Sequence, residues 1–469
     1  MPQPQPRTTE ILALLRREFG ADLITDAEGL LARSRDESGL VRPPVAVLLA
    51  RSEAQVARLM TLANKHGFPV IPRGAGTGLA GGCLAGKGGV VLDLAAMNRI
   101  LAIDTQSLTA TVQPGVITAD LRDAAKAVGL FYPPDPASLA TSTIGGNAAT
   151  NAGGPACVKY GTTRDYVLGL TAVLPTGEVI RAGANTRKGV VGYDLTRLLV
   201  GSEGTLGVIT ELTLKLIPHP RAAACVAAVF ADLNAAMRAI ISVMTRGHLP
   251  SAMEFLDARC LKLVGDLLPF SVAGEQSALV LIESDGDPDQ VRREVAGIEA
   301  ICRELGATNI LPPATTDEGR EAVWAVRRSV STRIHEDCAV YIPEDIAVPI
   351  GRIADMVAAL PEVEERFGIT IFAFGHAGDG NIHLNLTAQD EALRPKVEAA
   401  AVDCVRLALK LGGTISGEHG IGLVKRGLLP LEIGPVSLRV QRGIKALLDP
   451  QNVLNPGKIF PPEGAEDIP

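Results

Sequence analysis

The 469-residue chain has few aromatic residues, no close cysteine pair and no long apolar run. It contains one tryptophan, five tyrosines and ten phenylalanines. Its seven cysteines lie far apart with no CxxC pair, which favours reduced, packed thiols and argues against an iron–sulfur cluster or a structural zinc knuckle. The most apolar stretch, 226–244, is interrupted by Asp232, Asn234 and Arg238, so it falls short of the roughly 18 clean apolar residues of a membrane span.

The chain also lacks an excess of positive charge. Its formal net charge is −7, which disfavours a nucleic-acid partner and an anionic membrane surface. The start, MPQPQPRTTEILALLRREFG, has no basic and apolar signal segment. We therefore expect a cytoplasmic protein that could reach a membrane only peripherally, through a partner. Hydrophobic residues make up 47% and charged residues 21%, as in globular proteins, and the length predicts two or three domains.

Hydrophobic periodicity predicts helices over 8–19, 53–66 and 118–128, the second capped by Ser52 and Gly67. The runs VAVLLA, PVIP and GVVLDL read as strands. The two prolines of IPHPRA, residues 217–222, predict a domain boundary. Beyond it, the strands CVAAVFA, AMEFLD and ALVLIES alternate with helices, which predicts an α+β layer with helices on one face of an open sheet. We expect a loose tail at the C-terminus.

Glycine is the residue in excess, with 49 copies. The segment 72–89 holds a GxGxxG match at Gly76–Gly81 after a strand, and Asp93 ends a later strand. A Rossmann motif should open a helix, and the further glycines of this segment do not allow one. The remaining interpretations are a loop whose backbone N–H groups surround a phosphate and a mobile surface loop.

Two further glycine-rich segments favour the ligand interpretation. Residues 133–161 read as a second glycine loop, with Ser142, Thr143, Asn147 and Asn151 as hydrogen-bonding groups for a flat polar ligand. A third, GSEGTLGVIT at 201–210, runs from a glycine turn into a strand. Three such segments imply one large ligand.

Several blocks carry a family resemblance: PRGAGTGLAGG, PPDPAS, STIGGNAATNAGG, KYGTTRDYVLGL, GYDLTRLLVGSEGTLGVIT, GHAGDGNIHLN, GEHGIG and DPQNVLNPGK. Over roughly residues 40 to 460 they resemble the FAD-linked oxidase family, which includes D-lactate dehydrogenase, the D subunit of glycolate oxidase and D-2-hydroxyglutarate dehydrogenase. The resemblance implies an α+β fold: a two-subdomain FAD-binding module, vanillyl-alcohol-oxidase-like, followed by an α+β cap domain with an antiparallel sheet.

The resemblance implies a domain order and a set of FAD contacts. The domains are a helical segment 1–40, the FAD-binding domain 41–219, a substrate domain with a metal site 220–420, and a helical segment 421–469 that returns to the FAD domain. Gly74 to Leu79 would hold the pyrophosphate, and Gly207 and Ile209 the adenine end. The implied FAD residues are Arg73, Gly74, Ala75, Gly76, Thr77, Gly78, Leu79, Pro134, Asp135, Ser142, Gly145, Gly146, Asn147, Asn151, Gly207, Ile209 and Asn455. The first loop offers no histidine for a covalent link, so we expect non-covalent FAD.

The histidines form the second candidate site. His383 and Asn385 alternate in IHLNL and so share one face of a strand, and the turn after His376 could fold that residue back towards them. From spacing alone, histidines that simply pack in the core remain the stronger alternative. The resemblance implies that His376, His383 and Glu418 bind a divalent metal, Zn²⁺ or alternatively Fe²⁺ or Mn²⁺. It implies Asn385 as a substrate or flavin contact and His419 as the base.

Oxidation of a 2-hydroxy acid needs these groups together. A divalent ion lowers the pKa of the substrate hydroxyl, a histidine accepts its proton, and an arginine binds the carboxylate. Arg327 is the candidate arginine, with a solvated helix residue as the alternative. Relatives that act on hydroxyglutarate have a threonine and a lysine for the second carboxylate. Here Ser331 and VYIPEDI stand in those places, which favours D-lactate or glycolate, although Arg333 could substitute.

The leading hypothesis is an FAD-linked D-2-hydroxy-acid dehydrogenase. The alternatives are a D-2-hydroxyglutarate dehydrogenase, a non-catalytic FAD-binding subunit of a glycolate oxidase complex, and an ether-lipid synthase, whose run of histidines is missing. The electron acceptor would be external: an electron-transferring flavoprotein, an iron–sulfur subunit, a cytochrome or a quinone. The sequence also allows a homodimer. Glu344 and Asp345 read as surface or turn acids outside the site.

Overall fold

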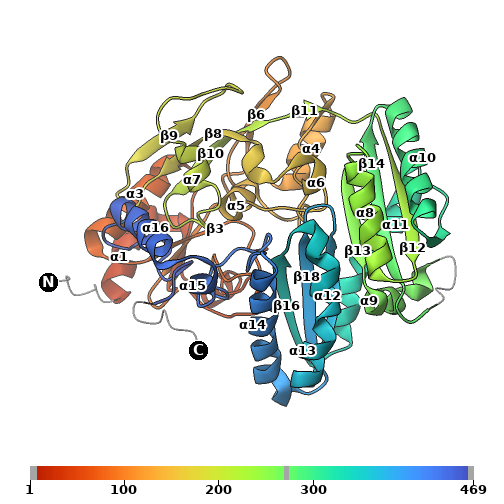
Figure 1. Ribbon diagram of the computed structural model, residues 1–469. Helices are drawn as coiled ribbons and strands as arrows, with labels where there is room; N and C mark the ends of the chain where they lie inside the picture. The colour runs from red at the N-terminus through yellow and green to blue at the C-terminus, as the bar shows by residue number, and fades with distance from the viewer. Residues whose placement is uncertain (1–7, 269–273, 463–469) are drawn as a thin grey trace. The chain divides into compact units, whose positions relative to one another are not determined.

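The computed structural model describes residues 8–268 and 274–462. The final residues, for which we expected a loose tail, lie outside this range from 463 onwards. The chain divides into two compact units. Unit 1 contains residues up to 153, 162–218 and 418 onwards, and unit 2 contains 154–161 and 219–417. Figure 1 colours the chain by residue number and labels its elements.

Unit 1 contains two larger sheets and an antiparallel pair of short strands, β7 and β11. The first has the order β1-β2-β4-β3, in which β4 pairs in parallel with both β2 and β3. The second, β5-β6-β10-β8-β9, is antiparallel throughout. The strands are β1 (Leu23–Ile24), β2 (Ala46–Leu49), β3 (Val70–Arg73), β4 (Val90–Asp93), β5 (Ile100–Asp104), β6 (Thr109–Val112), β7 (Leu130–Phe131), β8 (Val167–Val173), β9 (Val179–Gly183), β10 (Val208–Lys215) and β11 (Ile217–Pro218).

The helix α3 (Glu53–His66) of unit 1 follows its sequence signals closely. Ser52 accepts a hydrogen bond from the Gln55 N–H, and Gly67 ends the helix in the left-handed conformation, as predicted. Its apolar face packs into the core around the parallel strands. The other helices are α1 (Thr8–Phe19), α2 (Ala27–Leu31), α4 (Thr118–Lys126), α5 (Ile144–Thr150), α7 (Leu195–Leu199), α15 (Leu429–Glu432) and α16 (Pro435–Leu448).

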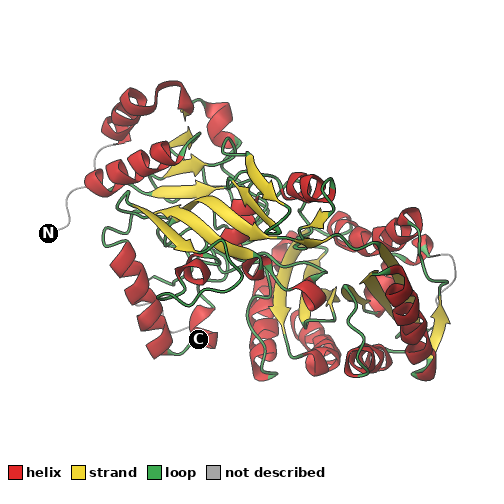
Figure 2. Cartoon of the chain, turned by 90° about the horizontal axis from the view of Figure 1, so that it is seen from above, coloured by secondary structure: helices red, strands yellow, loops and turns green. Residues whose placement is uncertain are grey.

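Unit 2 is an antiparallel seven-stranded sheet with the order β15-β12-β14-β13-β17-β18-β16. Its strands are β12 (Ala222–Phe230), β13 (Ala252–Leu256), β14 (Ala278–Gly286), β15 (Ala307–Ile310), β16 (Val340–Ala347), β17 (Thr370–His376) and β18 (Asn381–Ala388). Its helices are α6 (Cys157–Tyr160), α8 (Leu233–Thr245), α9 (Ala258–Leu263), α10 (Pro288–Glu304), α11 (Asp317–Glu336), α12 (Ile353–Ala358), α13 (Leu360–Phe367) and α14 (Arg394–Lys410). Figure 2 shows helices beside the strands of each sheet.

The prediction that helices cover only one face of this sheet is wrong. Alternate residues of β12, including Ala227, pack with Val326 and Val330 of α11. The intervening residues Val226 and Ala228 are equally buried, and α8 and α10 contact the same strand. A strand that is buried on both faces has no polar alternation, so CVAAVFA did not reveal which face is covered.

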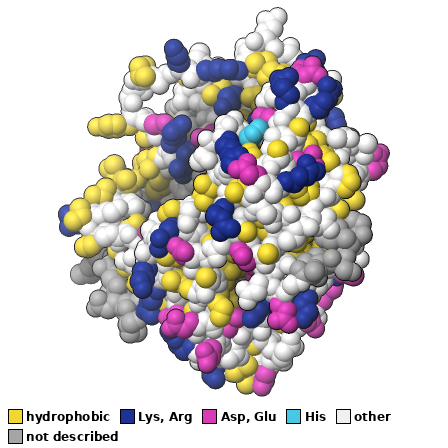
Figure 3. Space-filling model, turned by 45° about the vertical axis from the view of Figure 1, so that its right-hand side comes forward, with side chains coloured by type: hydrophobic (Ala, Val, Ile, Leu, Met, Phe, Trp, Pro, Cys, Tyr) yellow, Lys and Arg dark blue, Asp and Glu magenta, His cyan; other side chains and the backbone are white. Residues whose placement is uncertain are grey.

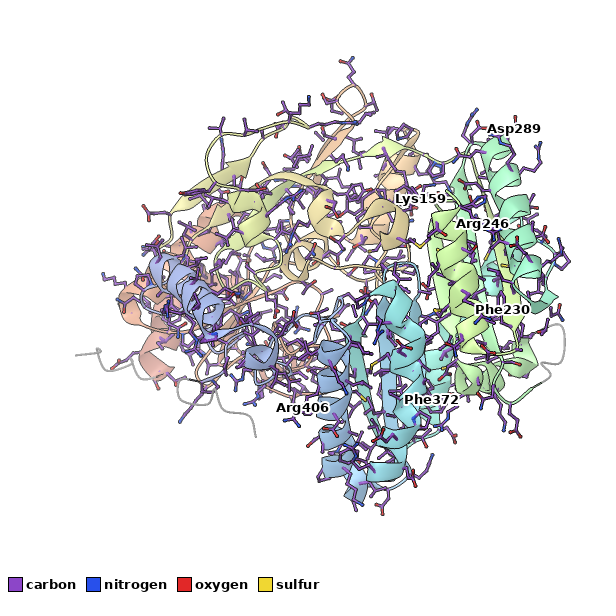
Figure 4. All side chains as sticks on the ribbon, viewed as in Figure 1. Lys159, Phe230, Arg246, Asp289, Phe372 and Arg406 are labelled. Carbon is purple, nitrogen blue, oxygen red and sulfur yellow. The ribbon has the colours of Figure 1, made fainter. Side chains whose placement is uncertain are left out.

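The short segment 154–161 is held to unit 2 by a buried acid. Lys159 donates to the carboxylate of Asp285 at 2.5 Å and to its carbonyl oxygen at 2.7 Å, and the Tyr160 hydroxyl donates to the same carboxylate. Lys159 is labelled in Figure 4. These bonds explain why eight residues from the middle of the unit 1 sequence group with the second sheet.

Candidate active site

His376 and His383 meet across the hairpin of β17 and β18. The four-residue turn 377–380 joins the strands, and the register pairs Phe374 with His383. The two Nε2 atoms lie 3.3 Å apart, with the rings almost perpendicular. His376 is buried, and the His383 side chain is 13% exposed. The turn therefore folds His376 back as predicted, and the two ring nitrogens face each other.

Glu254, from the neighbouring strand β13, contacts the Nδ1 atom of His376, on the side of the ring away from His383. Its Oε1 lies 2.5 Å from the His376 Nδ1, and its Oε2 accepts a 2.7 Å hydrogen bond from the Arg327 Nε of α11. Burial alone would raise the pKa of this carboxyl, but His376 and Arg327 together hold it below its usual value. Sequence reasoning missed Glu254, because nothing in AMEFLD distinguishes it from a solvent-facing residue of a strand.

Arg327 is not a solvated helix arginine. Its side chain is 12% exposed, and its guanidinium lies 4.5 Å from the centre of the Phe374 ring. Its hydrogen bond to Glu254 uses Nε, and Nη1 and Nη2 make no hydrogen bond within the described part of the chain. These two nitrogens are the pair that binds a carboxylate in a bidentate manner.

The interpretation of Glu344 and Asp345 as surface or turn acids is wrong. Both are buried in β16, and Asp345 pairs in register with His383. The Asp345 carboxylate lies 3.8 Å from the His383 Nδ1 and accepts a 2.7 Å hydrogen bond from the Asn381 side chain. β16 includes Pro343 and is an edge strand of the sheet, where proline is tolerated.

Asn385 lies one step further along the same face of β18. It is buried, and its Nδ2 makes no hydrogen bond of good geometry in the described structure. The Tyr341 hydroxyl interacts with the side chains of Asn385 and Ser331, and burial raises the pKa of Tyr341 to about 12. This side chain therefore stays neutral at physiological pH.

The segment with Glu418 and His419 begins at the end of unit 2. Gly417 is the last residue of that unit, and a β carbon on it would contact the Asn381 side chain and lie 3.0 Å from an Asp345 oxygen. Glu418 follows by one peptide bond, so its Cα is about 3.8 Å from that of Gly417. This segment therefore continues directly from the last residue of unit 2.

The turn after His419 is fixed within unit 1 by a buried carboxylate. Glu203 accepts hydrogen bonds from the backbone N–H groups of Ile421 and Gly422 at 2.8 and 2.7 Å. Burial raises the pKa of Glu203 although these N–H groups favour the ionised form. Glu203 belongs to the third glycine segment and has a positive φ of 51°. This segment therefore fixes the backbone at Ile421 and Gly422.

Gly380, in the turn between the histidine strands, is a position where a side chain should be costly. Its φ is +89°, and a β carbon would overlap the carbonyl oxygen of Val348. Gly380→Ala should lower the free energy of unfolding by about 2–4 kcal/mol, from left-handed strain plus overpacking. Gly368→Ala is the control, because Gly368 has φ +67° and open space around it. Urea titrations should show that the control lowers the free energy of unfolding by only about 1–2 kcal/mol. Equal decreases in the two variants would contradict the role of the overlap with Val348.

The first glycine loop has the character of an anion site. The backbone N–H groups of residues 74–79 donate no hydrogen bond within the described part of the chain. Gly76 has φ +80°, and a β carbon there would overlap the guanidinium of Arg73, which contacts Cys83. Consecutive unpaired N–H groups in a glycine turn are the elements of a phosphate-binding nest.

The interpretation of 133–161 as an irregular glycine loop is wrong. Residues 144–150 form α5, because the Thr143 hydroxyl caps the Gly146 N–H. Gly145 is required by packing, since a β carbon would lie 2.9 Å from the Pro114 carbonyl oxygen and closer still to its ring. Pro134 is buried and Asp135 is partly exposed in the segment before this helix.

The predicted polar contacts of this segment have partners inside the chain. Thr118 joins Ser142, at 2.9 Å between hydroxyls, to Asn147, whose amide donates to it at 2.8 Å. Asn151 accepts from the Thr162 hydroxyl and the Arg164 N–H. These side chains fix the backbone around α5.

Asn455 connects the first and third glycine segments. Its amide donates to the carbonyl oxygens of Gly82 and Glu203 at 2.9 and 2.8 Å. Gly207 packs under Leu199, and Ile209 is buried in β10. The C-terminal segment therefore fixes the spacing of the two loops within unit 1.

Comparison with known proteins gives consistent matches. Residues 44–183 match the family described as "FAD binding domain", and residues 219–459 match "FAD linked oxidases, C-terminal domain". The chain is 42% identical to the glycolate oxidase subunit GlcD of Bacillus subtilis (strain 168), over 89% of each chain. It is 39% identical to a D-lactate dehydrogenase of Anaerostipes hadrus, over 90% of each.

A solved structure of p-cresol methylhydroxylase with substrate bound superimposes with a TM-score of 0.78 at 17% identity, covering 96% of each chain. At this identity the likeness concerns the fold alone. Together with the two family matches, it confirms the predicted FAD-binding module followed by an α+β domain with an antiparallel sheet.

Proposed function

Because the chain belongs to the FAD-linked oxidase family, we propose that it oxidises a small D-2-hydroxy acid, D-lactate or glycolate, to the 2-oxo acid. The observation that carries this proposal is the buried cluster in unit 2, where two histidines, two carboxylates and an arginine meet on one face of the sheet. Relatives named for glycolate and D-lactate support the substrate class. A non-catalytic FAD-binding subunit would have no need of this cluster.

The loop around Gly76 fits FAD. Residues 74–79 offer unpaired N–H groups of the kind that bind a pyrophosphate, and the remaining predicted FAD residues lie within unit 1. The loop contains no histidine for a covalent link, so we propose non-covalent binding. When bound, FAD supplies the acceptor for the C2 hydrogen of the substrate, which leaves as hydride.

The histidine cluster fits a divalent metal. The two Nε2 atoms face each other, and each histidine has a carboxylate on its Nδ1 side, Glu254 for His376 and Asp345 for His383, as is usual for histidines that bind zinc. We propose His376, His383 and Glu418 as the ligands, with Zn²⁺ ahead of Fe²⁺ or Mn²⁺. When bound, the ion lowers the pKa of the substrate hydroxyl.

The remaining roles follow from the same arrangement. Arg327 would bind the substrate carboxylate through Nη1 and Nη2, because Glu254 and Phe374 hold its guanidinium in place. Asn385 would donate a hydrogen bond from its Nδ2 to substrate or flavin. His419, next to the proposed ligand Glu418, would accept the hydroxyl proton, since imidazole is the most frequent general base in enzymes.

The surroundings of Ser331 favour a substrate with one carboxylate. Neither Ser331 nor its neighbour Tyr341 can supply the positive charge that a second carboxylate would need, because one is a hydroxyl and the other a phenol. Arg333, the alternative cation, donates to Asp266 and to the Leu263 carbonyl oxygen, so the structure gives it no support as a second carboxylate site.

The substrate proposal predicts the result of an anaerobic flavin-reduction panel. D-lactate or glycolate should bleach the flavin absorbance at least tenfold faster than D-2-hydroxyglutarate or D-malate, about 1.4 kcal/mol of selectivity. Stopped-flow absorbance measures the rates, and metal analysis of the same sample accompanies them. If D-2-hydroxyglutarate reduces the flavin fastest, the result would support the alternative that the protein is a D-2-hydroxyglutarate dehydrogenase. A flavin that stays oxidised with every acid would support the alternative of a non-catalytic FAD-binding subunit.

The reduced flavin needs an external electron acceptor, because the seven cysteines are separate free thiols. We propose an electron-transferring flavoprotein, an iron–sulfur subunit, a cytochrome or a quinone. Within the described residues, no helix is both long and apolar enough to cross a membrane. The face shown in Figure 3 intersperses acidic and basic side chains, so it presents no extended basic patch for nucleic acid.

A further inference from the structure

We propose that Glu254 is a positioning residue that sets the orientation of His376 and Arg327 at once. This inference rests on the proposed function, in which His376 binds the metal and Arg327 binds the substrate carboxylate. Glu254 itself would touch neither. Its two oxygens would couple metal binding to substrate binding within unit 2.

The two oxygens of Glu254 serve different partners. Oε1 faces the His376 Nδ1 at 2.5 Å, and Oε2 accepts from the Arg327 Nε at 2.7 Å. A carboxylate at Nδ1 keeps the proton on that nitrogen, so Nε2 carries the lone pair that a metal needs. The bond to the Arg327 Nε and the contact with the Phe374 ring hold the guanidinium in place, and Nη1 and Nη2 make no hydrogen bond to Glu254.

A purely structural ion pair explains this arrangement less well. The Glu254 side chain is fully buried, and a buried pair seldom adds stability over apolar residues of similar volume. The Arg327 guanidinium alone would balance the negative charge of Glu254. Charge neutralisation therefore does not explain why Glu254 also contacts His376. Fixing the histidine tautomer supplies one.

Glu283 provides a matched control on the adjacent strand β14. Its carboxylate is also largely buried and also binds α11, through the Trp324 Nε1 at 2.8 Å and Arg320 at 3.5 Å. It pairs in register with Ala252, two residues before Glu254. Glu283 contacts no histidine in the described structure, so replacing it removes a similar charge from the same helix–sheet interface without affecting the proposed metal ligand.

The test compares Glu254→Gln with Glu283→Gln in the full-length, FAD-loaded protein. After metal removal, Zn²⁺ affinity is measured by competition with a chelating dye, and flavin content and thermal melting report folding. Glu254→Gln should bind Zn²⁺ about 10- to 100-fold more weakly, whereas Glu283→Gln should change by less than about threefold. At saturating Zn²⁺, the remaining defect of Glu254→Gln should lie in KM for D-lactate more than in kcat, because Arg327 has lost its anchor.

Unchanged Zn²⁺ affinity in a folded Glu254→Gln would overturn the inference, and so would equal losses in both variants, which would indicate general loosening of the sheet. If Glu254→Gln does not fold, Glu254→Asp keeps the charge but is too short to reach both partners. It should weaken Zn²⁺ binding about tenfold, and wild-type affinity there would also overturn the inference. A wild-type protein that binds no divalent metal would instead refute the metal part of the proposed function.

Discussion

Replacement of His383 by alanine is expected to slow anaerobic flavin reduction by at least about 10³-fold, about 4 kcal/mol in the barrier, while FAD stays bound. The loss is large because the variant lacks one of the two facing imidazoles, which is a proposed metal ligand. The substitution also removes the side chain that pairs with Asp345 across β16 and β18. Stopped-flow reduction by D-lactate gives the rate, and flavin absorbance gives the FAD content. Chelation of the wild-type protein should cause a loss of similar size.

His248→Ala is the matched control for this prediction. His248 lies in the same unit against Gly297 of α10 and outside the histidine cluster. Its removal should leave the flavin-reduction rate within about twofold, since residues this remote from a site rarely alter its chemistry. A metal-free His383→Ala protein that reduces its flavin at a near wild-type rate would show that the reaction proceeds without the imidazole pair.

The elements of the fold were largely predictable because their determinants are local. The α3 helix is set by Ser52, an amphipathic repeat and Gly67, all within sixteen residues. The exception is α5, in which Gly145 and Gly146 suggested a loop. The determinant of α5 is partly distant, because Pro114 leaves no room for a side chain at Gly145. A packing contact of this kind has no local signature.

The site was only half predictable, for the same reason. His376 and His383 lie in one hairpin, so alternation and a short turn indicated their meeting. Glu254 reaches His376 across 122 residues of sequence, and only the order of strands in the sheet brings the two together. Asp345 was set aside as a surface or turn acid, and only the pairing of β16 with β18 places it beside His383. The sequence did contain one signal. Proline is tolerated in an edge strand, so Pro343 was compatible with a strand that includes Asp345.

Gly76→Val is expected to weaken FAD binding more than 100-fold, over about 2.7 kcal/mol, so that the protein purifies largely as apoprotein. Valine at φ +80° is strongly disfavoured, and its side chain would displace the Arg73 guanidinium. Turning this residue out of the left-handed conformation would reorient the N–H groups of residues 74–79, which are the proposed pyrophosphate contacts. Flavin absorbance per protein and fluorescence titration of apoprotein with FAD measure the effect.

Gly88→Val separates backbone strain from loss of the binding loop. Gly88 belongs to the same glycine segment and has φ +74°, but a β carbon there meets open space. Both variants should therefore lose about 1–2 kcal/mol of folding stability to left-handed strain. Only Gly76→Val should lose FAD, because only its backbone forms part of the run of unpaired N–H groups. Equal FAD affinities in the two variants would mean that residues 74–79 do not hold the pyrophosphate, and that another part of unit 1 does.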